Sequence, residues 1–234
     1  MNRTMKSIAV LMLMMVFAVG CNKPDNGGNN NENEVNDHEF VDLGLPSGTL
    51  WATCNVGADT PEDYGDYFAW GESEIKAVYK FVTYKFGNSI DSTLTKYCNN
   101  PYYGYNGFSD TLTVLQKDDD VVSIQWGDEW RLPTKKEWEE LYQNTNVTWT
   151  TQNGVNGRLL TAANGNSLFL PAGGYRGGKC FWKVGSGGYY WSSSLYNDFP
   201  YSAYFFGFNY SDYYGWSSTN RYLGQSVRAV RSAN

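Results

Sequence analysis

The chain has 234 residues, a formal net charge of −6 and one histidine, His38. A nucleic-acid groove needs clustered lysine and arginine to replace phosphate counterions, and here basic and acidic residues are scattered, so the composition argues against nucleic-acid binding. A single histidine also argues against a histidine-ligated zinc site and a Ser-His-Asp triad. The sequence indicates no cofactor.

Residues 1–20 have the pattern of a secretory signal, in which Arg3 and Lys6 precede an apolar run from Ile8 to Val19. This run is shorter than the roughly 20 residues that span a bilayer. We therefore expect a cleaved signal and no retained transmembrane helix.

The signal ends in VFAVGC, which resembles the lipobox of bacterial lipoproteins, with Ala18 in place of the usual leucine. The resemblance implies that Cys21 carries a lipid, becomes the mature N-terminus and holds the protein on a membrane. The alternatives are a cleaved soluble protein and an inert cysteine. Lys23 and Asp25 loosely resemble the surface-export signal of Bacteroidetes lipoproteins, which implies a cell-envelope location at the outer membrane, exposed at the surface.

Residues 21–37 are polar and rich in glycine and asparagine, which predicts a flexible tether. Residues 38–234 suffice for one domain with a sizeable core. Their three cysteines, Cys54, Cys98 and Cys180, lack CxxC spacing, so a disulfide framework is not the organising principle. Cys54–Cys98 is the pairing that we favour, and buried free thiols are an equally good alternative.

The folded part reads as short strands separated by glycine. Residues 50–56 alternate in the manner of a half-buried strand, after a turn at Ser47–Thr49. Further β-prone segments lie at residues 63–72, 78–86, 167–178, 202–211 and 225–230. No segment has the length and periodicity of a long helix. The pattern predicts an α+β class that is mostly β and loop-rich, with one or two short helices.

One short amphipathic helix is well defined. Thr134 is its predicted N-cap, and Glu137 closes a capping box three residues later. Trp138 and Leu141 share a face that we expect to seal the core, with the glutamates solvated. The alternative, a catalytic pair of Glu137 and Glu140, needs a cleft and a raised pKa.

Asp118–Asp120 offer the hard oxygen ligands that calcium prefers, without EF-hand spacing. The alternative is a solvated turn, or the cap of a short helical piece before Trp126. The sequence assigns no metal.

Several ordered motifs resemble a known family. WRLPTKKEWEEL, residues 130–141, resembles the RLPTEAEWE signature of the formylglycine-generating enzyme superfamily. From Glu39 to Arg231 the chain is similar to Fibrobacter succinogenes major paralogous domains and their Bacteroides lipoprotein relatives, through EFVDLGLPSGTLWA, GDYFAWGE, LTKYC, LFLPAGGYR, YYWSSS and GQSVRAVR. The resemblance implies a C-type lectin-like fold, in which the helix is scaffold and the C-terminal strands present a binding face.

The resemblance also bears on catalysis and metal. Oxidase members of the superfamily use a cysteine pair, with copper, near their C-terminal end, and residues 189–234 contain no cysteine. Calcium-dependent lectins usually show EPN or QPD and WND triplets, which this sequence lacks. We therefore expect neither a formylglycine-type enzyme nor a calcium-dependent lectin.

Nearly half of the positions between Tyr189 and Tyr222 are aromatic. Strand alternation would place one set of rings at the surface, where tyrosine mixed with serine, asparagine and glycine has the composition of a paratope. A protein or a glycan is the expected ligand, since aromatic faces also stack on sugars. The alternative is that these rings fill the core.

The predicted ligand-binding residues are Tyr196, Asn197, Asp198, Tyr201, Tyr204, Phe206, Phe208, Tyr210, Asp212, Tyr213, Tyr214 and Trp216. Four of them share the predicted exposed face of one strand: Tyr204, Phe206, Phe208 and Tyr210. Trp191 and Ser192–Ser194 are assigned to scaffold and turn. Arg228 and Arg231 are expected to form salt bridges or to cover the strand edge.

The fixed flanks YYWSSS and GQSVRAVR also resemble those of retroelement-diversified lectin-fold proteins, in which adenine-bearing codons are rewritten. Most of the predicted set suits a rewritten asparagine codon, and Trp216 does not. The sequence thus predicts an envelope-anchored lipoprotein that binds a protein or glycan through an aromatic face. The alternative is a structural or enzymatic accessory of cell-envelope glycan handling.

Overall fold

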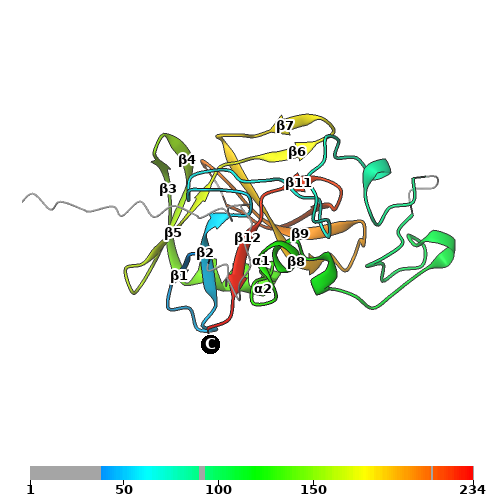
Figure 1. Ribbon diagram of the computed structural model, residues 1–234, viewed down its shortest axis with the longest axis horizontal. Coiled ribbons are helices and arrows are strands. Elements are labelled where there is room, and N and C mark those ends of the chain that lie inside the picture. Colours follow the sequence, from blue (N-terminus) through cyan, green and yellow to red (C-terminus); the bar gives the residue numbers. More distant parts are fainter. Residues whose placement is uncertain (1–37, 90–92, 212, 234) are drawn as a thin grey trace, which may run out of the picture.

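The computed structural model describes residues 38–89, 93–211 and 213–233, without the side chains of residues 213–216. Within these ranges the chain forms four three-stranded antiparallel sheets and two short α-helices (Figure 1). The predicted class, α+β and mostly β, is confirmed. Three 3-10 helices lie in the connections: η1 (Phe81–Thr83), η2 (Tyr105–Gly107) and η3 (Lys117–Asp119).

The first and last strands that the structure describes lie in one sheet, in the order β1 (Phe40–Asp42), β2 (Leu50–Asn55) and β12 (Arg228–Arg231). The prediction that β2 is half-buried is wrong. Trp51 packs into one core cluster and Ala52 into the other, because β2 runs between the two.

Arg228 corrects a second expectation. Its side chain is buried, and its guanidinium donates to Asn55 Oδ1 at 2.9 Å and to the carbonyls of Ala52 and Phe169, with no acidic partner among the described residues. Burial lowers the pKa of Arg228 to about 10. The expected salt bridge exists only for Arg231, which pairs with Glu129 at 3.6 Å.

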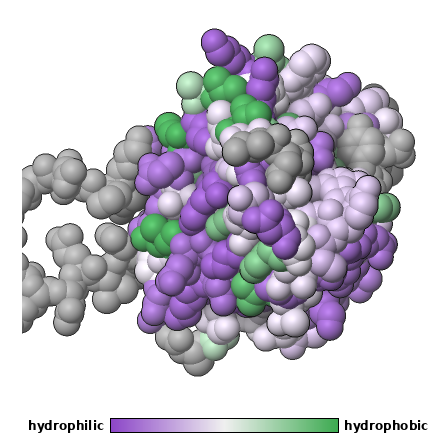
Figure 2. All heavy atoms as spheres, turned by 90° about the vertical axis from the view of Figure 1, so that its right-hand side faces the viewer, coloured by the Kyte–Doolittle hydropathy of each residue, from purple (hydrophilic) through white to green (hydrophobic). Residues whose placement is uncertain are grey.

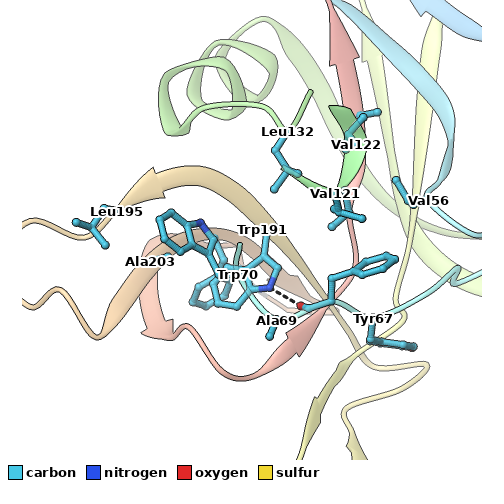
Figure 3. Close-up of a cluster of buried hydrophobic side chains, with 14 of the residues drawn as sticks. Val56, Tyr67, Ala69, Trp70, Val121, Val122, Leu132, Trp191, Leu195 and Ala203 are labelled. Carbon is cyan, nitrogen blue, oxygen red and sulfur yellow. Dashed lines mark hydrogen bonds between the residues drawn. The ribbon is translucent and has the colours of Figure 1, made fainter. Parts of the chain in front are cut away.

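The central sheet has the order β10 (Tyr213–Asn220), β9 (Ser202–Asn209) and β8 (Gly187–Leu195). It separates the two core clusters, since Trp191 and Phe205 pack into the first and Tyr190 and Phe206 into the second. Figure 3 shows part of the first cluster, where Trp191 Nε1 donates to the Phe68 carbonyl at 2.8 Å. The scaffold role predicted for Trp191 is confirmed. The neighbouring serines lie within β8 rather than in a turn.

Helix α2 (Lys135–Gln143) begins as predicted, with Thr134 as N-cap and a complete capping box to Glu137. Trp138 is buried and stacks on Phe206, with ring centroids 4.7 Å apart and planes 5° apart. The helix therefore attaches to the central sheet through the face that the sequence predicted, which includes buried Leu141.

Glu137 is not solvated. Its side chain is only 14% exposed and pairs with Arg131 at 2.5 Å. Burial opposes its charge, but hydrogen bonds from Arg131 and Thr134 outweigh this effect and lower the pKa of Glu137. Glu140 accepts from the Ser47 amide at 2.8 Å. Glu137 thus holds the Arg131 side chain and the Thr134 amide, whereas Glu140 holds the Ser47 amide. The two carboxylates have separate structural partners and do not form a pair.

Helix α1 (Val121–Trp126) is capped by Asp120, whose side chain accepts from the Val122 amide. This confirms the capping alternative for the acidic run.

The two remaining sheets flank the centre (Figure 1). The first has the order β3 (Thr145–Gln152), β4 (Val155–Ala162) and β5 (Ser167–Pro171), and the second β11 (Gly224–Gln225), β6 (Tyr175–Gly177) and β7 (Cys180–Trp182). The β-prone segments 63–72 and 78–86 contain no named strand, only isolated bridges and η1. Their rings fill the first core cluster instead, for example Phe68 and Tyr84.

Candidate functional site

The predicted ligand-binding residues do not form one face. Phe206 and Phe208 are 1% and 0% exposed, so the prediction that they face the surface is wrong. The reason is that the central sheet is covered on both sides, which buries both sets of alternating side chains. Tyr213, Tyr214 and Trp216 occupy β10. Their side chains, and the whole of Asp212, fall outside the described part.

The exposed members lie at opposite ends of β9. Tyr201 directly precedes the strand and Tyr210 directly follows it. Nine residue steps in a strand span roughly 30 Å at about 3.3 Å each. Tyr210 is 75% exposed and has Trp149 beside it, with ring centroids 6.1 Å apart. The predicted set is therefore split between the two ends of the strand.

The turn end, between β8 and β9, carries a continuous series of rings. Tyr196, Phe199, Tyr201 and Tyr204 come from the turn and the start of β9, and Tyr102 and Tyr103 come from residues 99–108. Successive centroids lie 5.1–6.0 Å apart in the order Tyr102, Tyr103, Tyr201, Phe199, Tyr196 and Tyr204. We call these six residues the aromatic row. Tyr102, Phe199 and Tyr201 are 83%, 43% and 37% exposed.

Two chain segments far apart in the sequence meet at the row. The Asn99 side-chain amide donates to the Asn197 carbonyl at 2.8 Å. In Figure 1 the orange β8–β9 turn and the green segment 99–108 lie together on the right-hand side. Figure 2 looks onto this side and shows mainly pale and purple groups with isolated green ones, as expected for tyrosine among polar residues.

Arg221 connects the β8–β9 turn to segment 99–108 through hydrogen bonds below the aromatic row. Its amide donates to the Tyr201 carbonyl at 3.1 Å. Its buried guanidinium donates to the carbonyls of Tyr97 at 2.9 Å and Lys96 at 3.2 Å, just before segment 99–108. Burial lowers the pKa of Arg221. Because its partners are the backbone of Tyr201 and the backbone that leads into segment 99–108, Arg221 sets the separation of the two segments.

Asp110 closes the base of segment 99–108. Its carboxylate accepts from the amides of Tyr97 at 2.7 Å and Cys98 at 3.1 Å. Within the segment, a side chain at Gly104 would lie 1.7 Å from the Phe108 carbonyl oxygen, so only glycine fits there. Segment 99–108 is thus a loop of defined conformation, which positions Tyr102 and Tyr103.

Charge at the row is sparse. Lys135 Nζ lies over the Tyr204 ring, 5.2 Å from its centroid. A hydrogen bond to the Asp198 carboxylate raises the pKa of Tyr196. Residues 99–108 contain no Asp, Glu, Lys or Arg. The row therefore presents rings, hydroxyls and amides, which suit a largely neutral ligand.

The described residues contain no group of three His, Cys, Asp or Glu side chains that could hold a metal ion. Asp119 has another role, because it binds Lys85 at 2.8 Å, Lys96 at 2.5 Å and the Tyr97 hydroxyl at 2.7 Å. Burial opposes the charge of Asp119, but these hydrogen bonds outweigh it and lower the pKa. Burial raises the pKa of Asp120 to about 6, against hydrogen bonds from backbone amides.

The cysteines correct the favoured pairing. Cys98 is a buried free thiol and Cys180 an exposed one. The Cys54–Cys98 pair is therefore wrong, and the free-thiol alternative holds for Cys98. Its Sγ instead donates to the Asn100 carbonyl at 3.1 Å, and burial raises the pKa of the thiol. Cys180 is not the small core residue that a lone cysteine predicts.

Sequence reasoning missed Tyr102, Tyr103 and Phe199. The first two lie in NNPYYGYNGF, which has the same mixture of tyrosine, asparagine and glycine as the C-terminal region. That composition is the signal by which the sequence could have indicated them.

No helix in the described part is long and apolar enough to cross a membrane. No family model, curated protein or solved structure matches the chain.

Proposed function

We propose that this protein is a lipid-anchored binding protein of the bacterial cell envelope, with a C-type lectin-like fold, and that the aromatic row is its ligand site. The observation that carries the proposal is the row itself, six neighbouring rings brought together from two segments about a hundred residues apart. The ordered sequence motifs support the fold, and Cys21 after the apolar run supports the anchor.

The row suits recognition because its rings are both rigid and accessible. Tyrosine offers a large amphipathic contact with few rotatable bonds, so little conformational entropy is lost when a ligand binds. The loop beneath is already fixed by Arg221 and Asp110, which reduces the cost of ordering further. Asn197 and Asp198 are exposed beside the rings and offer polar contacts for specificity.

The binding test uses the full chain. Wild type is applied to an array of bacterial and animal glycans and to a display library of cell-surface proteins, which covers both expected ligand classes. Tyr103→Ala and Tyr201→Ala are tested against every positive, and Tyr210→Ala is the matched control at the other end of β9. We expect losses above ~2 kcal/mol for one or both row variants, since a few central aromatic residues dominate most interfaces. Equal binding by all three variants would contradict the assignment of the site.

The diversification hypothesis remains part of the proposal, in narrower form. Tyr196, Asn197, Asp198 and Tyr201 lie at the surface end of the sheet, where replacement leaves the core intact. Phe206 and Phe208 are core positions, which tolerate few replacements. Deep sequencing of the 3′ end of the gene, with its flanking DNA, tests this. We expect substitutions at the first four codons beside an adenine-matched template repeat, and an invariant region without a repeat would refute diversification.

A further inference from the structure

A second surface combines exposed hydrophobic side chains with lysines. It consists of residues 75–83 and the β6–β7 hairpin with its exit, residues 175–184, and we call it the hairpin patch. The backbones of Tyr79 and Gly178 exchange two hydrogen bonds, of 2.8 and 2.9 Å. Arg176 also donates to the Lys76 carbonyl at 2.9 Å. The two segments therefore form one continuous surface.

The hydrophobic side chains of this patch are well exposed. The exposed fractions are 59% for Ile75, 62% for Val82, 56% for Phe181, 51% for Trp182 and 44% for Val184. Figure 1 places β6 and β7 along the top of the molecule. At the top of Figure 2, green groups lie between purple ones.

The patch is basic although the chain is acidic. Its two segments contain four lysines, one arginine and no Asp or Glu, in a chain of net charge −6. Lys76 pairs with Glu72, and Arg176 packs over the Tyr79 ring. The other three lysines are exposed and form no ion pair with a described residue: Lys80, Lys179 and Lys183.

We propose that the hairpin patch contacts the surface of an anionic phospholipid membrane. Tryptophan favours the membrane interface, and lysines beside it are attracted to anionic headgroups. Phe181 and Trp182 are consecutive in β7, so their side chains leave opposite faces of the hairpin. Phe181 lies beside Tyr67, with ring centroids 5.5 Å apart, and both Phe181 and Trp182 keep about half of their side chains exposed, so rings on both faces of the hairpin can contact a membrane interface.

The chain outside the described part supports a lipid surface as the occupant. Residues 1–37 include the apolar run and Cys21, the predicted lipid attachment site. A basic patch is a recognised second membrane signal beside a lipid anchor. The patch would also fix the orientation of the domain. The proposal does not depend on the aromatic row, whose ligand binding is measured separately.

The test is co-sedimentation of the purified full chain with vesicles of phosphatidylcholine alone or of an equimolar mixture with phosphatidylglycerol. Residues 1–37 are the same in every variant, so any binding by the N-terminal segment is constant. We expect wild type to prefer the mixed vesicles. K179Q/K183Q should lose about ten-fold or more of this binding, because each lysine near an anionic surface contributes to the attraction.

Matched controls separate a local effect from a change in net charge. K117Q/K136Q removes the same charge from exposed lysines outside the patch and should bind like wild type. Trp182→Ser should weaken binding, and Ile124→Ser, at a 48% exposed position on α1, should not. An unchanged urea midpoint shows that each variant is folded. Equal sedimentation of the two double variants, or no preference of wild type for the mixed vesicles, would overturn the proposal.

Discussion

The middle of β9 and its turn end have similar sequences and opposite environments. Phe206 and Phe208, in the middle, are almost completely buried, whereas Tyr201 at the turn end is 37% exposed. Both regions are rich in aromatic residues. The difference comes from what covers the sheet: Trp138 of α2 stacks on Phe206, whereas Tyr201 lies edge-on to Tyr103 of segment 99–108 and keeps part of its ring in water.

The comparison shows that aromatic density alone does not identify a binding surface. Alternation in a strand separates buried from exposed rings only when one face of the sheet is solvated. In this molecule both faces of the central sheet carry core, so the exposed rings are found where the strand ends. Replacement of residues in the middle of β9 and at its turn end tests this difference.

The largest effect is expected for Phe206→Ala. Removal of a fully buried phenyl ring leaves a cavity beneath Trp138, and such truncations cost about 3–5 kcal/mol. The free energy of unfolding, measured by urea denaturation, should fall by this amount. Phe206→Leu keeps most of the volume and should lose much less. If Phe206→Ala were as stable as wild type, the strand would have the exposed face that the sequence predicted.

The next effect concerns the capping box that fixes α2 against the sheet. The folded-state pKa of Glu137 is lowered, so its carboxylate contributes stability at neutral pH that begins to be lost near the unfolded pKa of about 4.3 and is fully lost only below the lowered folded-state pKa. Glu137→Gln should lower the free energy of unfolding by about 1–3 kcal/mol at pH 7, because Arg131 loses its charged partner. The difference from wild type should shrink towards pH 3, as urea titrations at the two pH values can measure. A gap that widened at low pH would contradict this account.

A double-mutant cycle compares ring contacts on the two sides directly. Trp138 and Phe206 are stacked in the core, and we expect a coupling energy of about 0.5–1.5 kcal/mol from Trp138→Leu, Phe206→Leu and the double variant. For Tyr103 and Tyr201, replaced by Leu in the same way, we expect less than ~0.5 kcal/mol because water surrounds part of both rings. Equal coupling in the two cycles would mean that the row is part of the core.

The local features of the fold could be predicted from the sequence. The start of α2 follows from side chains that hydrogen-bond to amides within one turn, and both Thr134 and Glu137 were identified. The cap at Asp120 is one of the alternatives that the sequence offers, for the same reason. Strands β2, β5 and β9 follow from β-branched and aromatic runs bounded by glycine and proline.

The sequence carries one further local signal, at Asn153 and Gly154. Asn153 and Gly154 both have positive φ at the tip of the β3–β4 hairpin, and Asn-Gly between β-prone segments is a strong hairpin signal. Burial was harder, because it depends on contacts between distant segments. Nothing near Phe206 indicates that Trp138 covers it, and nothing near Tyr201 indicates that Tyr103 lies beside it.

The smallest effect is expected at the exposed ends of β9. Tyr201→Ala and Tyr210→Ala each remove a ring that is partly or largely in water, so the free energy of unfolding should change by less than about 1 kcal/mol. Tyr210 is the more exposed and should matter less, although it retains a contact with Trp149. Thermal and urea denaturation of both variants provide the measurement. A loss at Tyr201 comparable to that of Phe206→Ala would place the row in the core. A ring that stability does not need, held among five others by a buried arginine, is instead what a ligand site requires.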